Sequence, residues 1–255
     1  MKLISSFLMF AFVSITAYAQ EKTPDLNIIS PRPDQLQAVV VTTQDWNAVQ
    51  GRGQIFERQS GASPWVAVDS AFPVVIGKNG MAWGKAYHEV SGDAEGVPMK
   101  IEGDRKSPAG IFMLTSAFSP AEQKVNLPFT KLLDSTECVD DVKSSHYNRI
   151  VDKSQVDQYD WDSSEKMRAI QEYELGIFIG YNPERKKGAG SCVFLHRWTD
   201  EKTGTTGCTA MALEQMQKIF RWIDGTKNPI LIQMPEKTYR QLQSAGNLPQ
   251  LSAFQ

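Results

Sequence analysis

Residues 191–223 read SCVFLHRWTDEKTGTTGCTAMALEQMQKIFRWI, and three patterns follow one another in them. The first is a short apolar, β-branched run at residues 191–195, which predicts a strand. A polar segment rich in Thr and Gly comes next and predicts a loop. The last is an apolar stripe at helical spacing, which predicts a helix whose stripe faces the core. Its members are Leu213, Met216, Phe220 and Ile223.

Two residues of this stretch carry the chemistry of a cysteine enzyme. His196 follows the predicted strand, and Cys208 lies twelve residues later, just before the predicted helix. A helix N-terminus has partial positive charge and free N–H groups, which favour a thiolate. Gly207 allows a sharp turn, and the N–H groups of Gly207 and Cys208 are natural donors to an oxyanion. We therefore predict that Cys208 is a nucleophile and that His196 is its general base.

The preceding chain is rich in short strand-like runs. From Leu36 to Ile76 these runs are separated by Gly, Ser, Asn and Asp, and residues 77–80 (GKNG) form a tight-turn signal. Residues 102–114 contain a glycine-bearing loop that leads into another strand, whereas residues 115–135 are irregular. Residues 138–173 have few regular runs and predict a long surface excursion, of the kind that often carries function.

Two more runs complete the expected sheet. Residues 176–181 and residues 229–235 are apolar and β-branched, and the second lies between two prolines. The sequence thus predicts a mostly β (α+β) fold with one clear helix, in one domain spanning residues 36–236. Residues 237–255 are expected to be a C-terminal tail with a weak helix.

The N-terminus has the pattern of a secretory signal peptide. Lys2 precedes an apolar run, and Ala17-Tyr18-Ala19 offers a cleavage site after Ala19. The run is too short for a membrane span, and no later segment is apolar enough for one. We expect residues 1–19 to be removed and residues 20–35 to form an extended lead-in. The mature chain is then periplasmic or in the cell envelope.

Composition limits the partners and the cofactors. The formal net charge is −2 and there is no basic block, which argues against nucleic acid and against an anionic membrane surface. Three cysteines are an odd number for an oxidising compartment, so at least one thiol stays free. A Cys138–Cys192 bridge and three reduced thiols both remain open. Zinc is not expected, because there is no Cys-x-x-Cys and no second close His.

Several blocks, in order, resemble the catalytic domain of the YkuD-type L,D-transpeptidases. The main ones are Gly77-Lys78-Asn79-Gly80, Gly103-Asp104-Arg105-Lys106-Ser107-Pro108-Ala109-Gly110-Ile111-Phe112, residues 190–196, and Thr205-Thr206-Gly207-Cys208-Thr209. Residues 138–141 (CVDD), Tyr147-Asn148 and residues 161–165 (WDSSE) are similar to one exported bacterial branch. The resemblance covers roughly residues 36–236.

This resemblance implies a β-sandwich-like domain with a helix after the catalytic Cys. It also implies that the Cys208 thiolate attacks the diaminopimelate–D-Ala bond of a peptidoglycan stem tetrapeptide, and that the resulting thioester passes to an acceptor amine. His196 takes the thiol proton and later gives it to the leaving amine. No metal or organic cofactor is required, and the product is a cell-wall crosslink.

Further residues are candidates for substrate binding or for loop structure. Those that could bind substrate are Thr205, Thr206, Arg197, Ser191, Asp140, Asp141, Tyr147 and Asn148. For the last four the alternative is hydrogen bonding that holds a loop, and for Ser191 it is ordinary bonding in a turn. Residues expected to have structural or plain surface roles are Gly103, Asp104, Pro108, Trp161, His88 and His146.

The sequence departs from the common family pattern at two positions. Thr206 stands where common members have a His, and Ala210 stands where they have an Arg that helps to hold substrate. The substrate-binding mode is therefore open. An L,D-carboxypeptidase, or a hydrolase that releases a wall-attached protein, shares the same acyl-enzyme. A non-catalytic wall-binding module would need neither Cys208 nor His196, so their presence argues against it. A papain-like protease is also disfavoured, because its Cys comes before its His in the chain, whereas here His196 precedes Cys208.

Overall fold

The computed structural model describes residues 30–84, 96–244 and 247–251. The expected signal peptide, most of the lead-in and His88 lie outside these residues. The described chain is mostly β, with two α-helices, as the sequence predicts.

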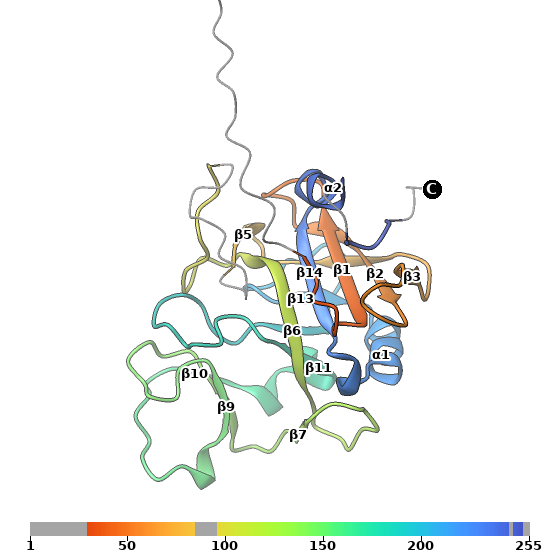
Figure 1. The fold of residues 1–255 in the computed structure, drawn as a ribbon. Helices are drawn as coiled ribbons and strands as arrows, with labels where there is room; N and C mark the ends of the chain where they lie inside the picture. Colours follow the sequence, from red (N-terminus) through yellow and green to blue (C-terminus); the bar gives the residue numbers. More distant parts are fainter. Residues whose placement is uncertain (1–29, 85–95, 245–246, 252–255) are drawn as a thin grey trace, which may run out of the picture.

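The main sheet closes on itself (Figure 1). Around the ring, each strand is hydrogen-bonded to the next in the order β1 (Gln37–Thr43), β14 (Ile230–Pro235), β6 (Ser107–Ser119), β11 (Gly176–Ile179), β12 (Phe194–Arg197), β13 (Thr209–Met211), β4 (Phe72–Val75) and β2 (Gln50–Glu57). The ring closes because β2 pairs antiparallel with β1 as well as with β4. The family-based expectation of a sandwich is met only at the level of a mostly β fold, because here the sheet joins its own edges.

Three short strands extend this sheet: β3 (Val66–Ala67) on β2, and β5 (Met81–Trp83) and β7 (Phe129–Lys131) on β6. The tight turn of residues 77–80 is present, with the Gly80 N–H bonded to the Gly77 carbonyl at 2.8 Å. The expected irregularity of residues 115–135 is partly wrong. Strand β6 continues to Ser119 and β7 pairs with it, because apolar Ala117 and Phe118 are fully buried.

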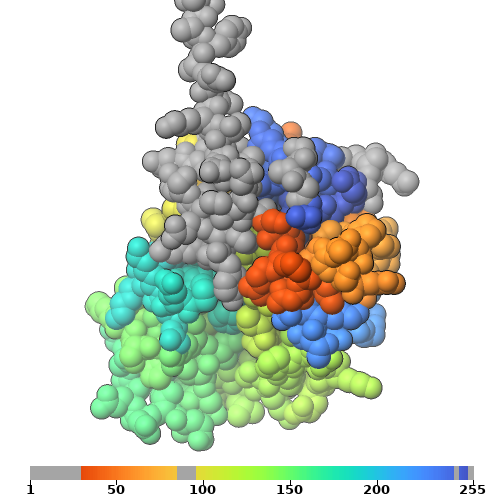
Figure 2. All heavy atoms as spheres, in the orientation of Figure 1, coloured from red at the N-terminus to blue at the C-terminus, as the bar shows by residue number. Residues whose placement is uncertain are grey.

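Residues 138–173 are not a plain loop excursion. Strands β8 (Thr136–Val139), β9 (Arg149–Asp152) and β10 (Ser164–Lys166) form a separate three-stranded sheet in the order β10-β8-β9. Four 3₁₀ turns also occur in the described chain, three of them in or just after this region: Lys153–Gln155, Met167–Ala169, Gln171–Glu174 (η5) and Gly225–Lys227. Figure 2 shows this part of the chain massed at one end of the molecule.

A disulfide joins the small sheet to the large one. Cys138 in β8 is bonded to Cys192, just before β12, with 6.0 Å between their Cα atoms. Of the two alternatives left open by the sequence, the structure therefore has the bridge. Cys208 is the remaining, free thiol.

Two helices cover the outside of the closed sheet. In α1 (Leu213–Trp222) the predicted stripe is confirmed, since Met216 and Phe220 are buried in the core together with Ile223 just after the helix. Helix α2 (Glu236–Ser244) packs on β1 and β14 and buries Tyr239 and Leu242. Neither helix in the described residues has the length and apolar character needed to cross a membrane.

Candidate active site

Two neighbouring strands bring Cys208 and His196 together. Strands β12 and β13 run parallel, with His196 opposite Ala210, and Cys208 directly precedes β13. Both residues line one pocket of about 270 Å³, which Thr205 and Thr206 line as well. The two residues singled out from the sequence thus share a cavity large enough for part of a substrate.

Cys208 is not at a helix N-terminus, contrary to the expectation. Strand β13 intervenes, and α1 begins only at Leu213. The thiol is buried, and this burial raises its pKa to about 12, with the nearby Glu165 carboxylate adding to the rise. The Phe194 N–H donates to the sulfur at 3.3 Å and partly offsets this rise, as does the positive charge of Lys100. A thiolate at Cys208 is therefore disfavoured by burial and favoured only by the donors and positive charge around it.

His196 is held as a neutral imidazole. Its Nδ1 lies 2.7 Å from the Arg197 carbonyl oxygen, and because a carbonyl only accepts, Nδ1 carries the proton. Nε2 then has the free lone pair. Burial lowers the pKa of His196 to about 4, against the opposing effects of this hydrogen bond and of the Glu172 charge. The Cys208 sulfur accepts the Phe194 N–H, and the thiol faces the Cys192 carbonyl oxygen as donor at 3.6 Å; among the described residues no hydrogen bond joins the sulfur to the His196 ring.

Ser107, in the block 103–112, contacts the backbone of Gly207 and Cys208. The buried Ser107 hydroxyl accepts the Gly77 N–H and faces the carbonyl oxygens of Gly207 and Cys208, each of these contacts being 2.9 Å. Thr205 donates to the same Cys208 carbonyl at 2.6 Å. Three blocks distant in sequence, 77–80, 103–112 and 205–209, are thus tied together around the backbone of Cys208.

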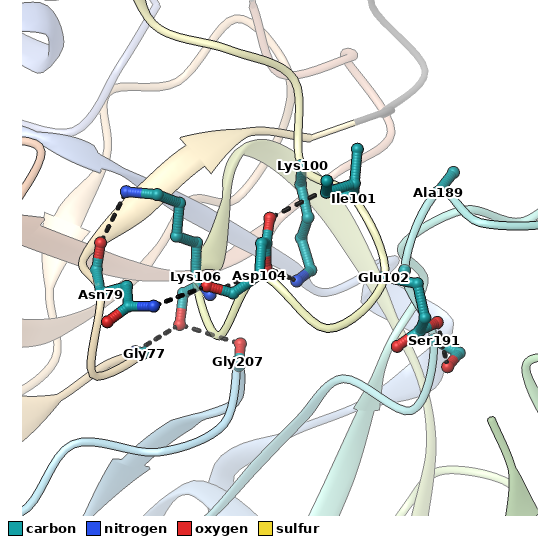
Figure 3. A network of polar contacts seen from close by, with 12 residues as sticks. Gly77, Asn79, Lys100, Ile101, Glu102, Asp104, Lys106, Ala189, Ser191 and Gly207 are labelled. Carbon is teal, nitrogen blue, oxygen red and sulfur yellow. Dashed lines mark hydrogen bonds and ion pairs between the residues drawn. The ribbon is translucent and has the colours of Figure 1, made fainter. Parts of the chain in front are cut away.

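The loop before Ser107 is built on a buried ion pair. Asp104 accepts Lys100 Nζ at 2.7 Å and also the backbone N–H groups of Ile101 and Lys106. Figure 3 shows Lys100 and Asp104 in contact close to Gly207, while Lys106 reaches the Asn79 carbonyl. The structural role expected for Asp104 is confirmed by these contacts.

The expected pair of oxyanion donors is reduced to one. The Gly207 N–H is already directed to the Thr205 hydroxyl at 3.1 Å. Gly207 has φ of 149°, so a side chain there would be strained, and an added Cβ would lie 3.3 Å from the Lys106 carbonyl. The expectation of an oxyanion donor then rests on the Cys208 N–H and stays a prediction.

The other expected binding residues do not line this pocket. Tyr147 and Asn148 hold the segment before β12, since Tyr147 accepts the Gly190 N–H and Asn148 accepts the Cys192 N–H. Asp140 accepts the Ser163 hydroxyl, and Arg197 lies 3.4 Å from Glu174. Their contacts are those of residues that hold loops, which is the alternative stated for Asp140, Tyr147 and Asn148.

Four remaining assignments also concern structure. Ser191 donates to Glu102, and Asp141 accepts the backbone N–H groups of residues 143 and 162. Trp161 is buried and donates from Nε1 to Glu137, so its expected role as a loop anchor is confirmed. His146 packs its ring against Trp161 at 5.3 Å between centroids.

Sequence reasoning missed several residues of the pocket. Tyr173, in η5, and Glu165, in β10, both line it together with Glu172. The Tyr173 hydroxyl donates to Glu165 Oε2 at 2.6 Å and also hydrogen-bonds the Cys208 thiol. The Tyr173 ring lies 5.4 Å from the ring of His196. The only available signal was the block 161–165, which contains Glu165 but not its partner.

Comparison of the chain with protein-family models, with curated proteins and with solved structures gave no significant match.

Proposed function

We propose that this protein is a cysteine acyltransferase of the L,D-transpeptidase type, which acts on peptidoglycan stem tetrapeptides in the periplasm or cell envelope. The observation that carries the proposal is the shared pocket: the one free thiol of the chain and a neutral, oriented histidine line it from adjacent strands. The sequence resemblance supplies the substrate class, and the pocket is consistent with acyl transfer in general.

In the proposed reaction, the Cys208 sulfur attacks the carbonyl carbon that precedes D-Ala, and a thioester forms as D-Ala leaves. An acceptor amine then breaks the thioester. His196 serves as base and acid through Nε2: burial keeps its Nε2 lone pair free to take a proton, while the same burial lowers its pKa to about 4 and makes it a weaker base. The Cys208 N–H stabilises the oxyanion, while the Ser107 and Thr205 hydroxyls fix the carbonyl of Cys208 and thereby its orientation.

The rim of the pocket supports recognition of uncharged groups of a substrate rather than its carboxylates. The described lining residues include Thr199, Thr203, Thr205 and Thr206 and two glutamates, but no Lys or Arg. Because Ala210 replaces the arginine of common family members, a substrate carboxylate would find no positive partner in this lining. Hydroxyl hydrogen bonds to peptide groups of the stem take its place in the proposal.

The test is a product analysis. The mature protein and its Cys208→Ala variant are incubated with purified tetrapeptide muropeptides, and the products are read by mass spectrometry. Crosslinked dimers that have lost D-Ala, absent with the variant, are the expected result. Tripeptides without dimers would identify a carboxypeptidase instead. No change in either sample would overturn the tetrapeptide assignment.

A further inference from the structure

The proposed mechanism does not use Tyr173, a polar neighbour of the Cys208 thiol. Tyr173 lines the same pocket as Cys208 and Glu165; its hydroxyl donates to Glu165 Oε2 at 2.6 Å, and its interaction with the thiol lowers the pKa of Cys208. Its ring is fixed by edge contacts with Phe118 and Phe194, at 5.5 and 5.3 Å between centroids. The hydroxyl therefore has little freedom to choose other partners.

A tyrosine hydroxyl has one hydrogen, so it donates to only one of these two neighbours at a time. When Glu165 is ionised, the hydroxyl donates to the carboxylate, and the thiol keeps its proton and faces the Cys192 carbonyl at 3.6 Å. When Glu165 is protonated, it donates to the Tyr173 oxygen, and Tyr173 donates to a thiolate. The two arrangements differ by the transfer of one proton from Cys208 to Glu165 and have the same total charge.

We propose that Tyr173 is a further catalytic residue, which shuttles the thiol proton to Glu165 and shares the acid–base task with His196. Glu165 is then a positioning residue that stores the proton. This inference rests on the proposed function only for its substrate, because the proton transfer itself takes place in the free protein.

The chemistry balances in both halves of the reaction. The proton leaves sulfur, passes through Tyr173 and rests on Glu165, while the sulfur lone pair forms the C–S bond and the carbonyl electrons move to oxygen. The C–N bond then breaks, and the stored proton returns through Tyr173 to the leaving nitrogen. When the acceptor amine breaks the thioester, its surplus proton returns sulfur to the thiol. No positive charge has to form on the buried His196 during the attack.

The charges around the relay suit proton storage on Glu165. Burial raises the pKa of Glu165 to about 7, and the negative charges of Asp140 and Glu102 add to the rise, against the hydrogen bond from Tyr173. Lys100 favours the thiolate on the other side of Cys208. His196 faces Glu172 and Arg197. A carboxyl that gains a proton near neutral pH is therefore the best acceptor within reach of the thiol.

The experiment measures the thiolate directly, by the rate at which iodoacetamide alkylates Cys208 between pH 5 and pH 10 in the full chain. The relay predicts a rate that rises through about pH 7 and then levels, because below that pH Glu165 already holds a proton and cannot accept another. In Tyr173→Phe and in Glu165→Gln the step near pH 7 is lost, and the rate at pH 8 falls at least about tenfold. Thermal unfolding shows whether each variant is folded.

The sign of the Glu165→Gln effect separates the relay from a purely electrostatic role. Glu165 raises the pKa of the thiol by its negative charge, so without a relay its removal would speed alkylation at pH 8. Faster alkylation of Glu165→Gln, or an unchanged step in Tyr173→Phe, would overturn the proposal. The matched control is Glu174→Gln, which removes the carboxylate next to Tyr173 in the sequence, paired with Arg197 and outside the pocket lining. It should keep the step, and loss of the step there would also overturn the proposal.

Because alkylation needs no muropeptide, the two proposals fail separately. Loss of the step in both variants without any muropeptide product would leave the relay standing and remove the substrate assignment. Crosslinked product from the native protein, together with a pH 7 step that persists in both variants, would keep the substrate assignment and remove the relay.

Discussion

The Cys138–Cys192 disulfide should contribute a large part of the stability of this protein. The two cysteines are 54 residues apart in sequence, and both are buried. Closing a loop of that length in the unfolded chain removes about 14 cal/mol/K of entropy, or about 4 kcal/mol at 25 °C. We therefore expect the double variant Cys138→Ala/Cys192→Ala to lose about 4 kcal/mol of unfolding free energy and about 8–16 °C in Tm.

The assay is urea unfolding followed by tryptophan fluorescence, with the double variant beside the native protein with and without dithiothreitol. The reduced native protein keeps both sulfur atoms in the core. The difference in unfolding free energy between it and the double variant therefore measures the packing lost with the two sulfurs. Reduction and substitution should give similar losses. A loss below about 1 kcal/mol in both samples would refute the reasoning, and would mean that the unfolded chain is already compact around this loop.

Three further outcomes are expected. Ser107→Ala leaves the buried Gly77 N–H without its acceptor and should cost about 1–3 kcal/mol in urea unfolding, together with a lower kcat; an unchanged unfolding midpoint would count against this. Burial raises the pKa of Glu137, but hydrogen bonds from Lys166, Ser164 and Trp161 outweigh burial and lower that pKa to about 2. The ionised carboxylate therefore stabilises the fold above pH 4.5, and this stabilisation is lost as the pH falls toward 2. The urea midpoint of the native protein should accordingly fall between pH 5 and pH 3 more than that of Glu137→Gln, and equal falls would contradict the assignment. Gly207→Ala should reduce kcat far more than stability, because the backbone strain falls on the residue next to Cys208. A muropeptide assay measures kcat, and a thermal scan measures the change in Tm.

Much of the fold was predictable because its signals are local. The helix after Cys208 was found from the spacing of Met216 and Phe220, and strands β1, β2, β4 and β14 were found from apolar, β-branched runs between turn residues. Closure of the sheet was not predictable. It depends on β2 pairing with both β1 and β4, and no residue pattern within a single strand specifies two partners.

The site was predictable only where chemistry and sequence order coincide. Cys208 and His196 stand twelve positions apart on consecutive elements, so their meeting needs little tertiary information. Strand β13 was not predictable, because its three residues are too few to show the alternation of polar and apolar side chains that indicates a strand. Tyr173 and Glu165 line the pocket from η5 and from the small sheet, which the disulfide ties to the large one. In sequence they resemble an ordinary aromatic residue and an ordinary surface acid.

The pairing of β1 with β14 has a consequence for how the molecule comes into being. Ala38 lies opposite Ile230 in a parallel ladder, so the first strand of the ring waits for a partner that is made almost two hundred residues later. Loop closure over such a distance is slow, and until it occurs β1 and β6 present unpaired edges to other chains. A chain interrupted before residue 230 could not complete the ring. Formation of the ring therefore depends on a strand that is made long after β1, and the sheet around Cys208 is closed only once β14 has paired with β1 and β6.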